Sequence, residues 1–336
     1  DEYNVIPHSI GSTTLDDRVF LLLPSSVSLN SVAVDFYTMW DEKLATYICD
    51  FEKDPEYTIK GKTFSVVQSD LQFVFIDVKP EALNKVNESH REGHEQKEKA
   101  SVTVKASFED GLKGQIKPRG SATWNLYGKL PYNLKLDAPK DMFGLGPDKK
   151  WNLLANASDK TLLKNEEFFK LGRELGLDYT PKIKNVNLFI NSDYAGVYAI
   201  TTKVDKGKNR VNIGYNDFLI NLDAPNYETQ IEYNCHFWVN DDPEYQPYVD
   251  LVYPDKNSVN PAIKRKVQTK VQNLIDTIEC GSNADFSTVM DMESFAKYYW
   301  VQEISMNADG LFRSTYMYYK NKDKKWNNLF KFNIIF

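Results

Sequence analysis

Residues 18–78 are a series of short segments rich in β-branched and aromatic residues, separated by Pro, Asn and Gly. The segments read "RVFLLLP", "SVAVDFYTMW", "LATYICDFE", "YTIKGKTFSVV" and "LQFVFIDV". This composition and punctuation favour strands and turns. We therefore expect residues 1–100 to form a β-rich N-terminal module. Its last part, the strongly charged segment 79–100, is expected to be a solvated helix or a flexible excursion between strands.

The rest of the chain mixes strand and helix patterns. Three strands are expected within residues 101–136; in the last of them, Tyr132, Leu134 and Leu136 alternate with polar residues, so Lys135 points away from the apolar face. The segment "NVNLFINSDYAGVYAITTKV" is expected to be a β-hairpin, followed by a strand at "DFLINLD". Apolar residues at helical spacing predict helices over 160–175, 262–279 and 291–307, the last capped by Asp291. This order predicts an α+β protein with a β-rich front and a helical C-terminal part.

Composition narrows the class of protein. A hydrophobic fraction of 42% over 336 residues can fill a large core, and the net charge of −6 argues against nucleic acid as the main partner. No apolar run approaches the ~20 residues of a membrane span. The polar start "DEYNVIPHS", without Met, is typical of a trimmed secreted protein or of an excised part of a longer one. The two sequons, at Asn87 and Asn156, are close to the number expected by chance in a chain this rich in Asn, and a secreted glycoprotein is the favoured interpretation.

The cysteines and histidines offer little metal chemistry. Cys49, Cys235 and Cys280 lack CxxC spacing, which argues against a zinc ribbon or a thioredoxin-like site. One disulfide with one free thiol fits this number of cysteines, and Cys235 with Cys280 is the favoured pair. His90 and His94 have the i, i+4 spacing of a metal pair, but without a third ligand two exposed histidines are the favoured interpretation.

Other site motifs are missing or unspecific. The sequence contains no GxSxG, HExxH, GxxxxGK[ST] or GxGxxG. The segment "HFWVNDDPEYQPYVDLVYPD" mixes aromatic and acidic residues that could stack on sugars or bind Ca²⁺, although a strand with an ordered loop explains it better. Nothing places two carboxylates on facing elements, so a glycosidase is disfavoured.

Several long motifs occur in a specific order. They are "RGS" at 119–121, "KLPYNLK" at 129–135, "WNLLANASDKTLLKN" at 151–165, "FINSDYAGVYAITTK" at 189–203 and "DMESFAKYYWVQEISMNAD" at 291–309. Together they resemble the CotH kinase family, the spore-coat protein H group of atypical protein kinases. The resemblance extends over about residues 101–336, which we expect to be a CotH kinase-like domain, truncated at its C-terminal end because the family's domain normally continues further.

The resemblance implies a two-lobed, atypical-kinase-like fold and ATP with Mg²⁺ or Mn²⁺ as cofactors. Phosphoryl transfer needs cations on the phosphates, carboxylates on the metal, and a carboxylate near the attacking hydroxyl. By position, Arg119 and Lys135 match the family's basic residues and would bind nucleotide, and Asp309 would be the catalytic base or orient the hydroxyl. Considered alone, Arg119 and Lys135 fit a solvated strand edge equally well, and "NADG" around Asp309 is a common turn sequence.

The sequence also departs from the family pattern. Thr202 stands where Glu is usual, Lys164 replaces an Arg, and Ser121 replaces an Asn. Aligning "NNLFKFNIIF" with the family's closing G-P-x-W-D-F-D motif places Lys331 and Asn333 where two Asp residues belong. An ammonium repels Mg²⁺ and an amide is a weak ligand, so Asn333 is a degenerate metal position. Lys331 could instead contact a nucleotide phosphate directly.

Two functions from different classes follow. The first is a pseudokinase or weakly active domain that acts as an extracellular or cell-surface module binding a protein or a glycan. The alternative is an active secreted kinase that transfers the γ-phosphate of ATP to Ser or Thr of extracellular or surface proteins. Lys331 and Asn333 favour the first, and family resemblance favours the second.

Overall fold

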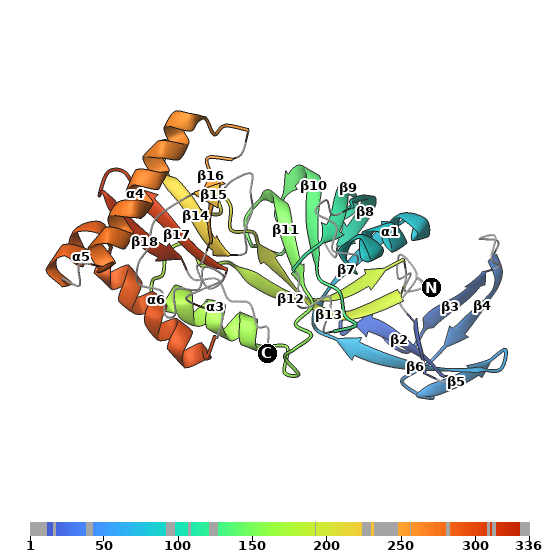
Figure 1. Ribbon diagram of the computed structural model, residues 1–336. Helices are drawn as coiled ribbons and strands as arrows, with labels where there is room; N and C mark the ends of the chain where they lie inside the picture. Colours follow the sequence, from blue (N-terminus) through green and yellow to red (C-terminus); the bar gives the residue numbers. More distant parts are fainter. Residues whose placement is uncertain are drawn as a thin grey trace. The chain divides into compact units, whose positions relative to one another are not determined.

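The computed structural model describes residues 12–15, 18–37, 43–91, 98–106, 109–120, 127–191, 193–223, 230–231, 248–255, 257–279, 283–307, 310 and 314–329 (Figure 1). These residues pack into two compact units. The first comprises residues 1–139, 153–155 and 185–200, and the second comprises 140–152, 156–184 and 201–336. The domain boundary proposed at residue 100 rests on motifs rather than on packing, and it stays a prediction.

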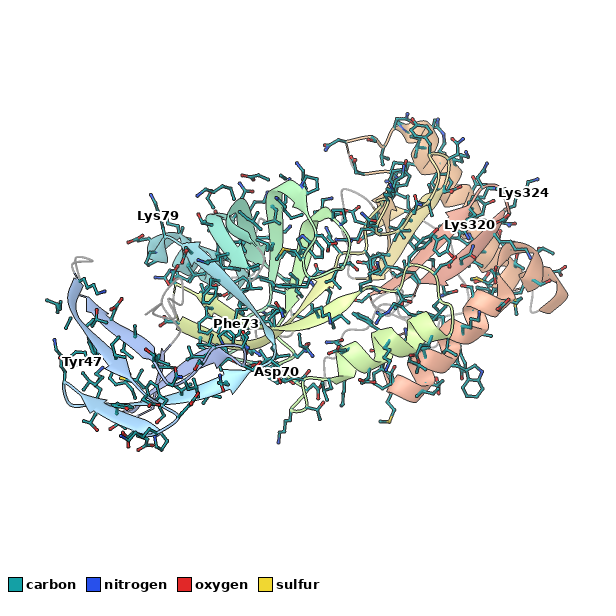
Figure 2. All side chains as sticks on the ribbon, turned by 180° about the vertical axis from the view of Figure 1, so that it is seen from behind. Tyr47, Asp70, Phe73, Lys79, Lys320 and Lys324 are labelled. Carbon is teal, nitrogen blue, oxygen red and sulfur yellow. The ribbon has the colours of Figure 1, made fainter. Side chains whose placement is uncertain are left out.

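The chain begins with the predicted β-rich module. Strands β1 (Ser12–Leu15), β2 (Arg18–Pro24), β6 (Lys62–Ser69) and β5 (Glu56–Ile59) form a sheet in the order β1-β2-β6-β5. Strands β3 (Val32–Tyr37) and β4 (Lys43–Cys49) form a separate antiparallel pair, which carries Tyr47 (Figure 2). Leu23, Val32 and Phe64 are among the buried residues that join the two sheets in one core. The thiol of Cys49 is free and buried there, and this burial raises its pKa.

A closed barrel follows the module. It contains β7 (Gln72–Val78), β8 (Ala100–Ala106), β9 (Glu109–Pro118), β10 (Tyr132–Lys140), β11 (Asp148–Leu154), β12 (Ile183–Ile190) and β13 (Asp193–Thr202), in the order β10-β11-β13-β12-β7-β8-β9. The predicted alternation in β10 is confirmed: Tyr132, Leu134 and Leu136 are buried and Lys135 is exposed. Helix α1 (Pro80–Arg91) packs against β8 and β9, so the first half of the charged segment is a helix.

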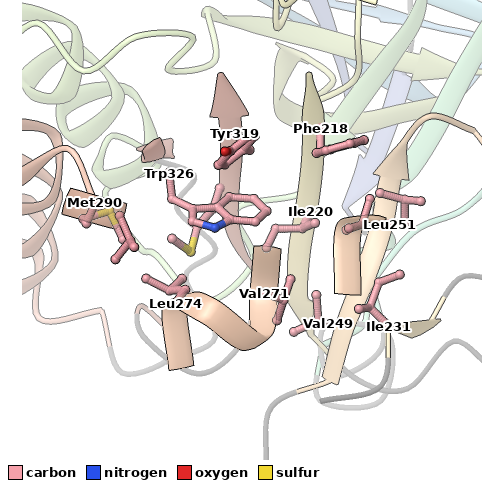
Figure 3. Close-up of a cluster of buried hydrophobic side chains, with 13 residues drawn as sticks. Phe218, Ile220, Ile231, Val249, Leu251, Val271, Leu274, Met290, Tyr319 and Trp326 are labelled. Atoms are coloured by element: carbon pink, nitrogen blue, oxygen red, sulfur yellow. The ribbon is translucent and has the colours of Figure 1, made fainter. Parts of the chain in front are cut away.

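The second unit is built on an antiparallel sheet in the order β15-β16-β14-β17-β18. Its strands are β14 (Phe218–Asp223), β15 (Gln230–Ile231), β16 (Tyr248–Tyr253), β17 (Thr315–Lys320) and β18 (Lys325–Leu329). Its helices are α3 (Lys164–Glu174), α4 (Pro261–Glu279), α5 (Asn283–Val289) and α6 (Met292–Ser305). Figure 3 shows Trp326 of β18 and Tyr319 of β17 with Val271 and Leu274 of α4 in one buried cluster. The predicted helices α4 and α6 are confirmed, while α3 begins four residues later than predicted.

The predicted fold class is wrong. Instead of a two-lobed α+β fold with a helical C-terminal part, the described residues are 44% strand and 24% helix, and they include the seven-stranded barrel. The physical reason lies in the second unit, whose sheet is buried on both faces. Phe218 and Tyr319 face the cluster with α4, whereas Leu219 and Tyr318 face a second cluster with Val211. Strands covered on both faces lack the two-residue alternation that marks a half-buried strand, so β17 was not predicted, although β14 was expected at "DFLINLD".

Candidate functional site

The two predicted phosphate contacts of the first unit lie on one face of the β9–β10 pair. Lys135 is exposed on β10 and pairs with Gln115 of β9. Arg119 directly follows β9, is half-buried, and its backbone N–H donates to the Pro131 carbonyl (3.1 Å). The register therefore separates the two backbones by about 13 Å along the strands, at ~3.3 Å per residue. The half-buried Lys117 lies between them on the same outward face. Their predicted role in nucleotide binding stays a prediction.

Lys129 is a polar site residue that the sequence reasoning missed. It precedes β10, and its Nζ donates a hydrogen bond to the Val197 carbonyl of β13. The same Nζ lies 4.6 Å from the centre of the Tyr198 ring. Burial lowers the pKa of the Lys129 amine to about 8. A half-buried lysine held in this way is chemically different from the solvated lysines on the strands beside it.

Two motifs that are far apart in the sequence meet around Lys129. The Tyr198 hydroxyl donates to the Leu130 carbonyl (2.9 Å), and the Tyr132 hydroxyl donates to Asn87 Oδ1 on α1 (3.1 Å). Both tyrosine rings are buried, with 2% and 4% of their surface exposed, and burial raises the pKa of the Tyr132 hydroxyl to about 12. The hydrogen bonds from Lys129 to Val197 and from Tyr198 to Leu130 therefore join the "KLPY" segment to the "GVY" segment of β13. The signal that could have indicated Lys129 is its position at the start of the K-x-PY-x-x-K pattern, where only the second lysine was considered.

In the second unit, the predicted catalytic Asp309 lies outside the described residues, but the chain on both sides of it is anchored. On its N-terminal side, α6 ends at Met306 in a left-handed conformation. The side-chain amide of Asn307 then donates to Gln302 Oε1 (2.7 Å), and its backbone N–H donates to the Gln302 carbonyl (3.2 Å). On the C-terminal side, the Gly310 carbonyl accepts hydrogen bonds from the hydroxyls of Tyr298 and Thr315.

Helix α6 is itself fixed to the sheet. Asp291 caps its first turn by accepting from the Ser294 backbone N–H (2.9 Å), as predicted. The Ser294 hydroxyl donates to the carbonyl of Asn328 on β18 (3.2 Å) and accepts from the backbone N–H of the same residue (2.8 Å). Helix α6 is therefore held in a fixed register against β18.

The β17–β18 hairpin has the start of β17 and the end of β18 at the same end. Thr315, which contacts Gly310, begins β17, and the next residue, Tyr316, pairs with Leu329 at the end of β18. Gly310, which follows Asp309 in the sequence, and Leu329, two residues before Lys331, therefore both lie at this end of the hairpin. Lys320 and Lys324 lie at the opposite end, at the turn (Figure 2). Lys331 and Asn333 themselves lie outside the described residues.

The comparison with known families matches these segments. The family model described as "CotH kinase protein" matches residues 116–330. The chain belongs to the CotH family. The matched range includes Arg119, Lys129, Lys135 and Asp309, and it ends one residue before Lys331. Among the curated proteins, none matches the chain.

The motif "WNLLANASDKTLLKN" includes a hydrogen-bonded turn in front of α3. Asn156 adopts a left-handed conformation (φ 50°). Its Oδ1 accepts from Asn165 Nδ2 (2.7 Å), and its Nδ2 donates to the Leu162 carbonyl (3.2 Å). The carboxylate of Asp159 accepts from the Thr161 and Lys164 backbone N–H groups (3.0 and 2.9 Å). Burial alone would raise the pKa of Asp159, but these hydrogen bonds outweigh it and hold the pKa below its usual value. The hydrogen bonds of the Asn156 and Asp159 side chains therefore stabilise this turn.

This turn also bears on glycosylation and on the departures from the family pattern. The Asn156 side chain is 7% exposed, and its Nδ2, the atom that a glycan would modify, is already bonded to Leu162. In the folded protein, the Asn156 amide is therefore too buried to be glycosylated. Thr202, where Glu is usual, is buried, and its hydroxyl accepts from the Lys182 backbone N–H (2.9 Å). In place of a charged group, this position holds a small hydroxyl that accepts one backbone hydrogen bond.

Several predicted residues cannot be placed. Ser121, Cys235, Cys280 and His94 lie outside the described residues, as does the His90 side chain. Within the described ranges, no three His, Cys, Asp or Glu side chains are grouped so that they could hold a metal ion. None of the helices that the structure describes has the length and apolar character needed to cross a membrane.

Proposed function

We propose that this CotH-family chain is a kinase-like domain that binds a nucleotide but transfers phosphate weakly or not at all. One observation carries the proposal. Tyr298 and Gln302 hold the residues on either side of Asp309, whereas aligning the closing segment with the family's motif sets Lys331 and Asn333 against its two Asp residues. This combination is what we expect of a domain that keeps the hydrogen bonds around its catalytic segment but has lost the ligands of its metal ion.

Electrostatics explains why this exchange matters most. Mg²⁺ and Mn²⁺ favour anionic oxygen ligands, so an ammonium and a neutral amide do not fit the site of a divalent ion. Phosphoryl transfer depends almost entirely on positioning and charge neutralisation, which leaves little catalysis once the metal is lost. Lys331 could supply one positive charge to the phosphates, whereas a divalent metal ion supplies two.

An active kinase is the second candidate, and the same anchors favour it. A segment without catalytic use would not require a buried tyrosine, a buried glutamine and a close-packed glycine on either side of Asp309. In this case the γ-phosphate of ATP would pass to Ser or Thr of an extracellular or surface protein, with Asp309 orienting the attacking hydroxyl.

Phosphate incorporation from labelled ATP with Mg²⁺ or Mn²⁺ separates the two candidates. The unmodified chain should incorporate little or no phosphate, and the double variant Lys331→Asp, Asn333→Asp should gain activity. Asp309→Asn made in the double variant should remove that gain, which controls for contaminating kinases. Transfer by the unmodified chain that disappears in Asp309→Asn would establish the active kinase instead.

We further propose that the partner is an extracellular or cell-surface protein or glycan; the aromatic and acidic residues of segment 236–255, which could stack on sugars, support this. Binding to immobilised glycans and to surface-protein extracts tests this. Uniform non-binding to both would remove the extracellular binding role, and it would leave the nucleotide proposal intact.

A further inference from the structure

The Lys129 ammonium has an incomplete set of partners. A lysine ammonium offers three N–H donors and a full positive charge. In the described part of the chain, its Nζ donates to the Val197 carbonyl and lies over the Tyr198 ring, and neither group carries a formal charge. No described carboxylate forms an ion pair with it, and desolvation is what lowers its pKa. A half-buried cation in such surroundings is stabilised by an anion.

The surroundings hold the amine in one place. Tyr198 is fixed by its hydrogen bond to the Leu130 carbonyl, so the ring beneath the amine cannot turn away. Gly196 has a φ of +103°, and a Cβ at this position would lie 3.3 Å from Lys129 Cε and 3.4 Å from Nζ. The absent side chain at Gly196 therefore leaves the space that the lysine occupies. A flexible side chain fixed before its ligand arrives loses less entropy on binding.

From these contacts we infer that the Lys129 amine is an anion-binding group whose ligand is a phosphate of the nucleotide. The inference rests on the proposed function for the identity of the ligand, whereas the anion site stands on the contacts of Lys129. A purely structural role, in which Lys129 only fastens the chain before β10 to β13, would need one hydrogen bond to Val197 and no charge. The two roles differ in how they respond to an anion and to pH.

The pH dependence follows from the same group. The amine binds an anion in its protonated form, and in the free protein it loses its proton at a pH of about 8. Affinity for a phosphate should therefore be highest below this pH and fall as the pH rises through it. Arg stays protonated throughout this range, so Lys129→Arg should keep an affinity that does not follow this change.

Protection of the amine from acetylation tests the inference without any variant. The intact chain is labelled briefly with acetic anhydride at pH 8, alone and with tripolyphosphate, ATP or adenosine, and the modification of each lysine is read by mass spectrometry. Lys129 should be protected about tenfold by tripolyphosphate and by ATP but not by adenosine, as expected for a charge-assisted contact. Lys324, exposed at the β17–β18 turn, is the reference whose labelling should not change.

Calorimetric titration of tripolyphosphate into Lys129→Met and Lys129→Arg supplies a second readout, with circular dichroism to verify the fold. Lys129→Met should bind at least about tenfold more weakly than the unmodified chain at pH 7. Unchanged labelling of Lys129 with a bound phosphate ligand would overturn the inference and leave the proposed function standing. Protection by tripolyphosphate without binding of ATP would support the anion site and defeat the nucleotide proposal. Absence of binding by either compound would overturn both.

Discussion

The Tyr298 hydroxyl donates a hydrogen bond to the Gly310 carbonyl, and this bond ties the residue after Asp309 to the middle of helix α6. The Tyr298 ring is buried, and Thr315 Oγ1 lies 3.0 Å from the same hydroxyl. Burial raises the pKa of Tyr298 to about 12, so the hydroxyl remains a donor at every physiological pH. The position of Gly310, which follows Asp309 in the sequence, therefore depends on a tyrosine in the body of the helix.

Tyr298→Phe should lower the free energy of unfolding by about 1–2 kcal/mol, because it removes a donor from a buried carbonyl and leaves the ring in place. Urea denaturation followed by circular dichroism measures the change. Tyr299→Phe on the neighbouring, partly exposed ring is the matched control and should change stability by less than about 0.5 kcal/mol. Equal effects of the two substitutions would show that the bond to Gly310 carries no stabilisation.

Gly310→Ala should lower the free energy of unfolding more than Tyr298→Phe does. An added Cβ would press against Gln302 Oε1 and lie 2.9 Å from the Asn307 carbonyl oxygen. We expect a loss of about 2–4 kcal/mol in the free energy of unfolding. Gln302→Ala should relieve part of the clash, so the double variant should be more stable than the sum of the single effects predicts. Gly128→Ala, where a Cβ would meet no atom within 4 Å, is the control. Strict additivity of the two changes would contradict the proposed contact.

The sequence predicted local features well and distant contacts poorly. The alternation in β10 and the Asp291 cap of α6 depend on neighbouring residues, and both are confirmed. Strand β17 was missed because residues on both of its faces are buried. Lys129 was missed because its acceptor lies 68 residues further along the chain, and no local pattern records such a contact. The roles of Asp309, Lys331 and Asn333 stay predictions that rest on the family pattern.

The Asn156–Asn165 pair should couple strongly in stability. Asn165 Nδ2 donates to Asn156 Oδ1 at 2.7 Å, and both side chains are buried. Each single change to Ala should reduce the free energy of unfolding by about 2–3 kcal/mol, because it leaves a buried amide without its partner. The double variant should lose at least about 1 kcal/mol less than the sum of the single losses, as measured in a urea double-mutant cycle. Lys164→Ala, at an exposed side chain beside Asn165, is the control.

Lys129 should make stability depend on pH in a direction opposite to that of an ion-paired lysine. Its folded-state pKa of about 8 lies below the unfolded reference of 10.5. Between these values the unfolded chain binds more protons, so the free energy of unfolding should rise with pH relative to Lys129→Met. The rise should be on the order of 1–3 kcal/mol between pH 7 and pH 10.5, reduced from the full shift because the amine is partly solvated. Urea denaturation at several pH values measures it, and subtracting the profile of Lys135→Met, at an exposed position on β10, corrects for the loss of one lysine. A corrected difference that stays flat or falls with pH would show that the Lys129 amine is not destabilised by burial, and it would remove the electrostatic basis for an anion site there.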